Sequence, residues 1–114
     1  MTEQTNFLTI LNYDNSVFEI IDYIKDHIRK RDCEKLEIDI SRLSLLDAGK
    51  VAILCSVYHF TKYPSGSICW HVCNNETKKI IQSMVLKNAT VNIINCYKKK
   101  VVYINSQFSS SGIN

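Results

Sequence analysis

Three groups of residues carry side chains whose types and spacing could support chemistry. Asp47 lies in the stretch SLLDAGKVA, between two apolar segments; Cys69, His71 and Cys73 alternate in ICWHVC; and Lys98–Lys100 form a basic run. Alternate residues of a strand point to the same side, so two thiols and one imidazole would share a face, and zinc prefers these ligand types. The hypotheses are a catalytic or phosphate-accepting aspartate, a zinc site and an anionic partner for the lysines.

The carboxylate of Asp47 has a structural alternative. A phosphate acceptor of the response-regulator receiver type needs an acidic pair after the first strand and a lysine near the fifth. Asp14 alone follows the first apolar run, and no suitable lysine is evident. An aspartate that begins a helix instead accepts a hydrogen bond from an N–H of the first turn and stabilises it by about 1 kcal/mol. We therefore predict that Asp47 caps a helix.

The Cys69, His71 and Cys73 group lacks the partners that a metal or an active site needs. A structural zinc takes four ligands, and ligands on alternate residues of one strand lie about 6 to 7 Å apart, too far for tetrahedral geometry. No second compact Cys/His pair, glycine-rich phosphate loop or signature of an activated nucleophile occurs. We predict ordinary packing of these side chains, no metal, no cofactor and no catalysis.

Composition favours one globular domain. The chain has 114 residues, of which 46% are apolar, and a formal charge of +3. Its lysines are dispersed outside the 98–100 run, so we expect no nucleic-acid partner. The N-terminal residues do not resemble a secretory signal, and no apolar run reaches the roughly 18 residues of a membrane span. We expect a cytoplasmic protein with five reduced cysteines.

Hydrophobic periodicity alternates between strand and helix patterns. Strands are predicted where apolar and polar residues alternate or where residues of high β-propensity gather. Helices are predicted where apolar residues recur at intervals of three and four. Ser16 with Glu19 forms a capping box, and Pro64–Gly66 ends the second helix at about Tyr63. The predicted strands are Phe7–Tyr13, Leu36–Ile40, Ile68–Cys73 and Val91–Ile94, and the helices begin near Ser16, Asp47 and Asn74 or Asn75.

This alternation predicts an α/β domain with a four- to five-stranded, mostly parallel or mixed sheet and three to four helices packed on it. Val101–Ile104 is either a fifth strand or the start of a terminal helix. We place a single domain at 1–105 and a flexible tail at 106–114. The second helix is apolar over most of its circumference, with Ile53, Val57 and Phe60 on a stripe of their own. It is therefore either deeply buried or presents apolar surface to a partner.

The central segment LEIDISRLSLLDAGKVAILCSVYHF resembles the core of STAS domains, the family of bacterial anti-sigma-factor antagonists and sulfate-transporter tails. Asp39, Ile40 and Ser41 match the Asp-Leu-Ser at the end of the family's strand, and Asp47 matches the start of its helix. The resemblance covers roughly residues 6 to 95 and implies a STAS-like fold. The family's phosphorylated Ser or Thr falls on Gly49 here, or on Ala48 with a shift of one residue, so neither alignment supplies a hydroxyl.

The resemblance implies a non-enzymatic interaction module in transcription regulation that binds an anti-sigma-factor or kinase-like protein without phosphorylation at the usual site. The alternatives are an accessory subunit bound to the ATPase of a membrane lipid transporter, and a small-ligand-binding domain. Pairing with a second copy through an edge strand is a further alternative. The residues expected to contact the partner are Ser44, Asp47, Ala48, Gly49, Lys50, Ile53 and Val57.

Overall fold

A computed structural model describes residues 5–11 and 15–94. The expected element at 101–104, the domain limit at 105 and the tail at 106–114 lie outside these ranges. Strands and helices alternate from the first element to the last, as the sequence predicts. They are β1 (Asn6–Thr9), α1 (Val17–Lys30), β2 (Lys35–Asp39), α2 (Leu45–Lys62), β3 (Ser67–Val72), α3 (Asn75–Ser83) and β4 (Ala89–Ile93).

The four strands form one parallel sheet in the order β1-β2-β3-β4, so each strand pairs with the next one along the chain. Mixed pairing, which the sequence left open, does not occur among the described strands. The register places Leu8, Ile38, Trp70 and Val91 in one row across the sheet. All four are buried, so this row forms one layer of the core.

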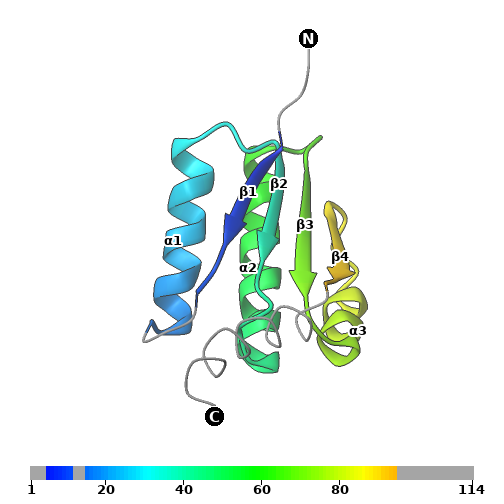
Figure 1. Cartoon of the computed structure of the whole chain (residues 1–114). Helices are drawn as coiled ribbons and strands as arrows, with labels where there is room; N and C mark the ends of the chain where they lie inside the picture. The colour runs from blue at the N-terminus through cyan, green and yellow to red at the C-terminus, as the bar shows by residue number, and fades with distance from the viewer. Residues whose placement is uncertain (1–4, 12–14, 95–114) are drawn as a thin grey trace, which may run out of the picture.

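The three helices form a single layer on one face of the sheet. Helix α1 packs against α2, and α2 packs against α3. Figure 1 shows α2 behind the strands, with α1 at the β1 side and α3 at the β4 side. Right-handed crossovers between strands that follow one another in space bring every helix to the same face. No described helix covers the opposite face, which we call the open face.

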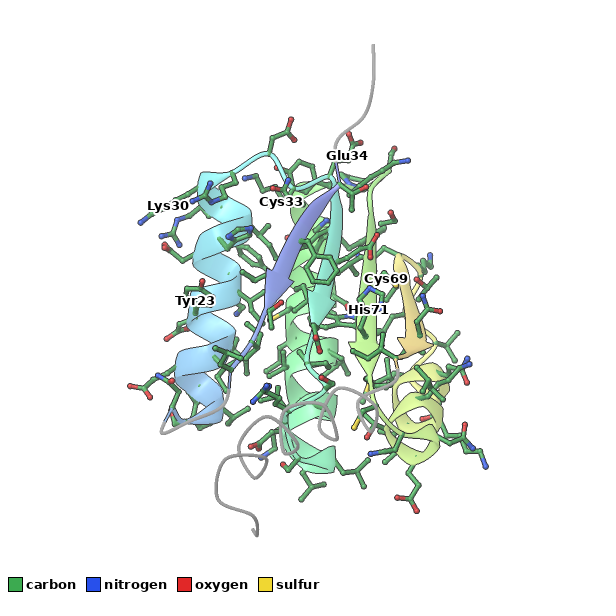
Figure 2. All side chains as sticks on the ribbon, in the orientation of Figure 1. Tyr23, Lys30, Cys33, Glu34, Cys69 and His71 are labelled. Carbon is green, nitrogen blue, oxygen red and sulfur yellow. The ribbon has the colours of Figure 1, made fainter. Side chains whose placement is uncertain are left out.

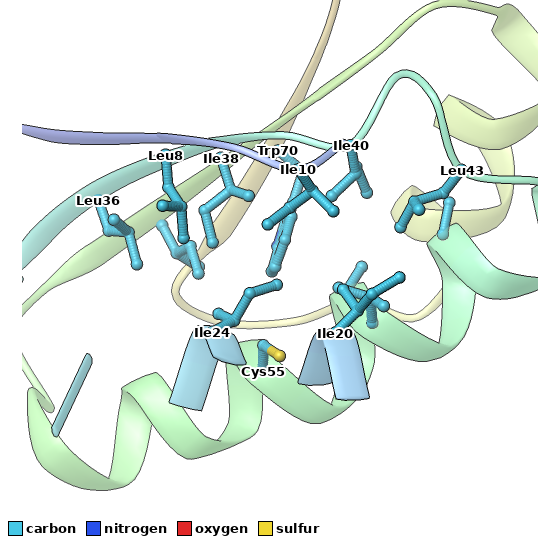
Figure 3. Packing of buried hydrophobic residues seen from close by; sticks show 14 of the residues in the cluster. Leu8, Ile10, Ile20, Ile24, Leu36, Ile38, Ile40, Leu43, Cys55 and Trp70 are labelled. Atoms are coloured by element: carbon cyan, nitrogen blue, oxygen red, sulfur yellow. The ribbon is translucent and has the colours of Figure 1, made fainter. Parts of the chain in front are cut away.

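The core lies between the sheet and the helices. Figure 3 shows Leu8, Ile38 and Trp70 pointing from the strands toward Ile24 of α1 and Cys55 of α2. Trp70, Ile24 and Cys55 are completely buried. Burying an aliphatic or aromatic side chain of this size stabilises the fold by about 1.5–3 kcal/mol, so this layer holds the helices on the sheet.

Side chains cap three helix ends, two of them by local contacts and one from another helix. Ser16 and Glu19 make the predicted capping box at α1, and Asn74 caps α3. At the other end of α1, the Nζ of Lys62 donates hydrogen bonds of 2.7 and 2.9 Å to the carbonyl oxygens of Ile28 and Arg29. These two oxygens have no partner within their own helix, so Lys62 supplies a C-terminal cap from α2.

Element boundaries differ from the sequence prediction at several ends. Helix α3 ends at Ser83, although Val85 continues the apolar spacing, because Val85 has a φ of 51° and leaves the helical conformation. Strand β4 starts two residues earlier than the predicted Val91, at Ala89. Strand β1 spans Asn6–Thr9, whereas the predicted strand began at Phe7 and extended to Tyr13, a residue outside the described ranges.

Candidate interaction surface

The N-terminal turn of α2 is capped by Ser44. The Ser44 Oγ accepts a 3.3 Å hydrogen bond from the N–H of Asp47, which is the third residue of the helix. The prediction that Asp47 is the cap was therefore wrong. The helix begins three residues earlier than predicted, and Leu45 and Leu46 belong to its first turn. Asp47 instead places a carboxylate near the positive end of the helix dipole.

Only part of the predicted contact segment reaches the surface. Ala48 and Gly49 are buried. A methyl group added to Gly49 would lie 3.5 Å from Cε of Met84 and 3.7 Å from Cγ2 of Ile80, both ordinary contacts, so this position faces α3. Lys50 is exposed. Ala48 and Gly49 therefore pack against the rest of the protein, and Ser44 and Lys50 are accessible to a partner.

The side of α2 that faces away from the sheet is largely apolar. Leu46 is 72% exposed, Val57 51%, and Ile53 and Phe60 37% each. Together with Lys50 they follow one line along the helix, at intervals of four, three, four and three residues. We call these five residues the outer stripe. Two further exposed apolar side chains flank it, Leu54 of α2 and Ile80 of α3.

The exposure of the outer stripe has a topological cause. Helix α2 lies between α1 and α3 and turns its buried side, which includes Val51, Ala52 and Cys55, to the sheet. Neighbours therefore cover three sides of the helix. The fourth side faces away from the protein, and exposed apolar residues gathered on one face are typical of interaction sites. Of the two outcomes predicted for this helix, deep burial does not occur, because Ile53, Val57 and Phe60 are exposed.

The Cys69, His71 and Cys73 group does not form a joint site. The Nε2–H of His71 donates a 2.8 Å hydrogen bond to Oε1 of Glu37 on β2, and Phe7 of β1 stacks on the imidazole with ring centroids 5.7 Å apart. Figure 2 shows Cys69 and His71 along β3. The two residues lie on the open face of the sheet, where neighbouring strands supply their contacts.

Both thiols of this group have neighbours of their own. Cys69 Sγ accepts a hydrogen bond from the side-chain amide of Asn92 at 3.8 Å, and the thiol of Cys73 donates to the carbonyl oxygen of Ser41 at 3.6 Å. In residues 5–11 and 15–94, no group of three or more His, Cys, Asp or Glu side chains is arranged to hold a metal ion.

Two further cysteines are unsuited to nucleophilic chemistry. Burial raises the pKa of the Cys55 thiol to about 12, and burial also raises the pKa of Cys33. A nucleophilic cysteine needs its thiolate form near neutral pH. Cys33 and Cys55 are fully buried, so they act as small core residues.

A polar network around His59 was not predicted from the sequence. His59 is fully buried; its Nε2–H donates a 2.7 Å hydrogen bond to the Cys33 carbonyl, and its Nδ1 faces the side-chain amide of Asn88 at 3.3 Å. The hydroxyl of Tyr63 accepts from the N–H of Cys33 at 3.0 Å. Burial lowers the pKa of His59, so its imidazole is neutral near pH 7. Through its two ring nitrogens, His59 joins α2 to the loop that contains Cys33 and to the loop that contains Asn88.

No model of a protein family, no curated protein and no solved structure matches this chain. The fold and site support only a broad class, an α/β protein with a four-stranded parallel sheet and three helices. Within the described part of the chain, none of the helices combines the length and apolar character that crossing a membrane requires.

Proposed function

We propose that this protein is a non-enzymatic protein–protein interaction module that docks its partner through the outer stripe of α2 and the exposed residues of the Ser44–Lys50 turn. The observation that carries the proposal is the exposure of Leu46, Ile53 and Val57 on one side of a helix whose other sides are covered. Removing these side chains from water on binding contributes roughly 25 cal/mol for each Å² of apolar surface buried.

The chemistry of the turn agrees with docking by shape and apolar contact. Ser44 already uses its hydroxyl oxygen to accept from the N–H of Asp47. No hydroxyl stands at Ala48 or Gly49, so the surface carries no phosphorylation switch at those positions. Lys50 adds one positive charge within the outer stripe, which a partner must accommodate or neutralise.

The more specific proposal is a STAS-like module related to anti-sigma-factor antagonists. It is supported by the similarity around Asp39–Ser41 and by the position of the Ser44–Lys50 turn at the start of α2. The Oδ1 of Asp39 accepts a 2.9 Å hydrogen bond from the N–H of Ser41, so this segment forms the bend that leads from β2 toward the turn. A kinase-like regulator and a transporter ATPase both remain candidate classes of partner.

Site-specific photocrosslinking tests the docking surface. A photoreactive phenylalanine analogue is placed at Val57 in the outer stripe and, as the matched control, at the exposed Lys30 at the end of α1 (Figure 2). We expect light-dependent adducts of defined mass from position 57 in extracts of the native organism and none from position 30. Equal labelling from both positions, or none from either, would contradict the proposal.

A further inference from the structure

We propose that the partner of the outer stripe is a second copy of this chain, which binds with its α2 antiparallel to the first and with Ile53 on the two-fold axis. This inference rests on the proposed function and names its partner. It differs from edge-strand pairing, because the contact is made by helices and leaves both edges of the sheet unchanged.

The spacing of the outer stripe is nearly symmetric about Ile53. Its residues 46, 50, 53, 57 and 60 lie seven and three residues before Ile53 and four and seven residues after it. An antiparallel partner centred on residue 53 therefore brings Leu46 against Phe60, Lys50 near Val57 and Ile53 against Ile53. Intervals of three and four residues are those of a seam between two packed helices, and two-fold symmetry requires such a self-complementary patch.

Charge selects the antiparallel arrangement over the parallel one. In a parallel pair the two Lys50 ammonium groups would face each other across the seam. In the antiparallel pair, Lys50 of one copy lies beside Val57 of the other, and the two lysines are separated by about six residues, or roughly 9 Å along the helices. The two helix dipoles are also opposed in this arrangement, because the first turn of each α2 lies beside the last turn of the other.

The small size of the contact indicates a weak, reversible association. Helix α2 has 18 residues, and Leu54 and Ile80 extend the apolar surface on either side of the outer stripe. A seam of this length between two single helices falls near the lower limit of roughly 1,200 Å² that stable interfaces bury. We therefore expect a reversible dimer in the micromolar range.

Two glutamate substitutions distinguish this arrangement from a nonspecific apolar patch. Ile53→Glu places two carboxylates against each other on the axis, and we expect the dimer to be lost. Val57→Glu places a carboxylate beside Lys50 of the other copy, and we expect the dimer to persist. Both are measured by sedimentation equilibrium from about 1 to about 500 µM, which brackets a micromolar dissociation constant. Circular dichroism of both variants confirms that they fold.

Disulfide trapping tests the axis directly. Ile53→Cys should form a covalent dimer under mild oxidation, since its two copies meet on the axis. Leu46→Cys should not, because its two copies lie 14 residues apart along the seam, about 21 Å, beyond the reach of a disulfide. A mixture of Leu46→Cys with Phe60→Cys should give the heterodimer, and the wild-type chain is the blank for its native cysteines.

The outcomes separate this inference from the proposed function. Loss of the dimer with Ile53→Glu but not with Val57→Glu, together with crosslinking at residue 53, supports the inference. A monomer at every concentration overturns it, as does a dimer that survives Ile53→Glu. If the monomeric protein still gives adducts of a different protein from position 57, the docking surface stands and only the choice of partner is wrong.

Discussion

The indole Nε1–H of Trp70 donates a 2.8 Å hydrogen bond to the Oγ of Ser56, and both residues are completely buried. This bond joins the centre of β3 to the centre of α2. The carbonyl oxygen of Ser56 also accepts a 3.1 Å hydrogen bond from the side-chain amide of Asn88, just before β4. One serine on α2 therefore connects the helix that carries the docking surface to the sheet and to the loop beside it.

Ser56→Ala should destabilise the protein by about 1–3 kcal/mol, because it leaves the indole N–H of Trp70 buried without an acceptor. Urea unfolding followed by tryptophan fluorescence measures the change. Ser65→Ala, at an exposed turn position, is the control and should have little effect. Equal free energies of unfolding for the two variants would show that the Ser56 bond contributes nothing.

The stability of the wild-type protein should fall as the pH drops below about 6.5. Burial lowers the pKa of His59 below its ordinary value of 6.5, so the unfolded chain binds a proton there more readily than the folded one. The stabilisation is complete above the unfolded pKa and is lost as the pH falls toward the folded pKa. Burial lowers the pKa of His27 as well, which adds dependence of the same sign.

His59→Gln isolates the first contribution. The difference in free energy of unfolding between wild type and variant should be largest near pH 8 and should shrink toward pH 5. Chemical denaturation at matched ionic strength provides the values. A difference that stays constant across this range would mean that His59 does not titrate on unfolding.

Ser44→Ala should cost about 1 kcal/mol of stability, since it removes the side chain that caps α2. Asp47→Asn keeps the size of the side chain and removes only its interaction with the helix dipole, so we expect a loss of about 0.3–1 kcal/mol that decreases at high salt. Thermal unfolding at low and high ionic strength compares the two. If Asp47→Asn lowered the stability more than Ser44→Ala, and by the same amount at low and high salt, Asp47 would be the cap of α2.

Val85→Gly should stabilise the protein by about 1 kcal/mol. Val85 has a φ of 51°, a conformation that costs an L-residue roughly 1–2 kcal/mol and glycine almost nothing. The valine side chain is 81% exposed, so little burial is lost. Val85→Ala is the comparison, because alanine keeps a Cβ and relieves only part of the strain, so it should stabilise less than Val85→Gly. Midpoints of urea unfolding measure both variants.

Much of the architecture follows from local signals in the sequence. Leu36 and Ile38 of β2 and Ile40 just beyond it alternate with polar residues, and all three are buried. Ser16 with Glu19 marks the start of α1 because the capping box involves only residues of one turn. Signals of this kind act over a few residues and need no knowledge of the rest of the fold.

The start of α2 shows the limit of such signals. Ser44 and Asp47 are both good capping residues, three positions apart, so local preference does not choose between them. In the structure Ser44 is the cap, and the helix that begins at Leu45 buries Ala48 and Val51. The contact between His71 and Glu37 likewise depends on the register of β2 against β3, which brings Asp39 opposite His71 and Glu37 opposite Cys69.

The sequence by itself determined that α2 is apolar on more sides than one neighbour can cover. It also determined the spacing of Leu46, Lys50, Ile53, Val57 and Phe60 along that helix. Which side stays uncovered was decided only by tertiary structure. The sequential strand order places all three helices on one face of the sheet, so α1, α3 and the strands cover three sides of α2 and leave the outer stripe in contact with water.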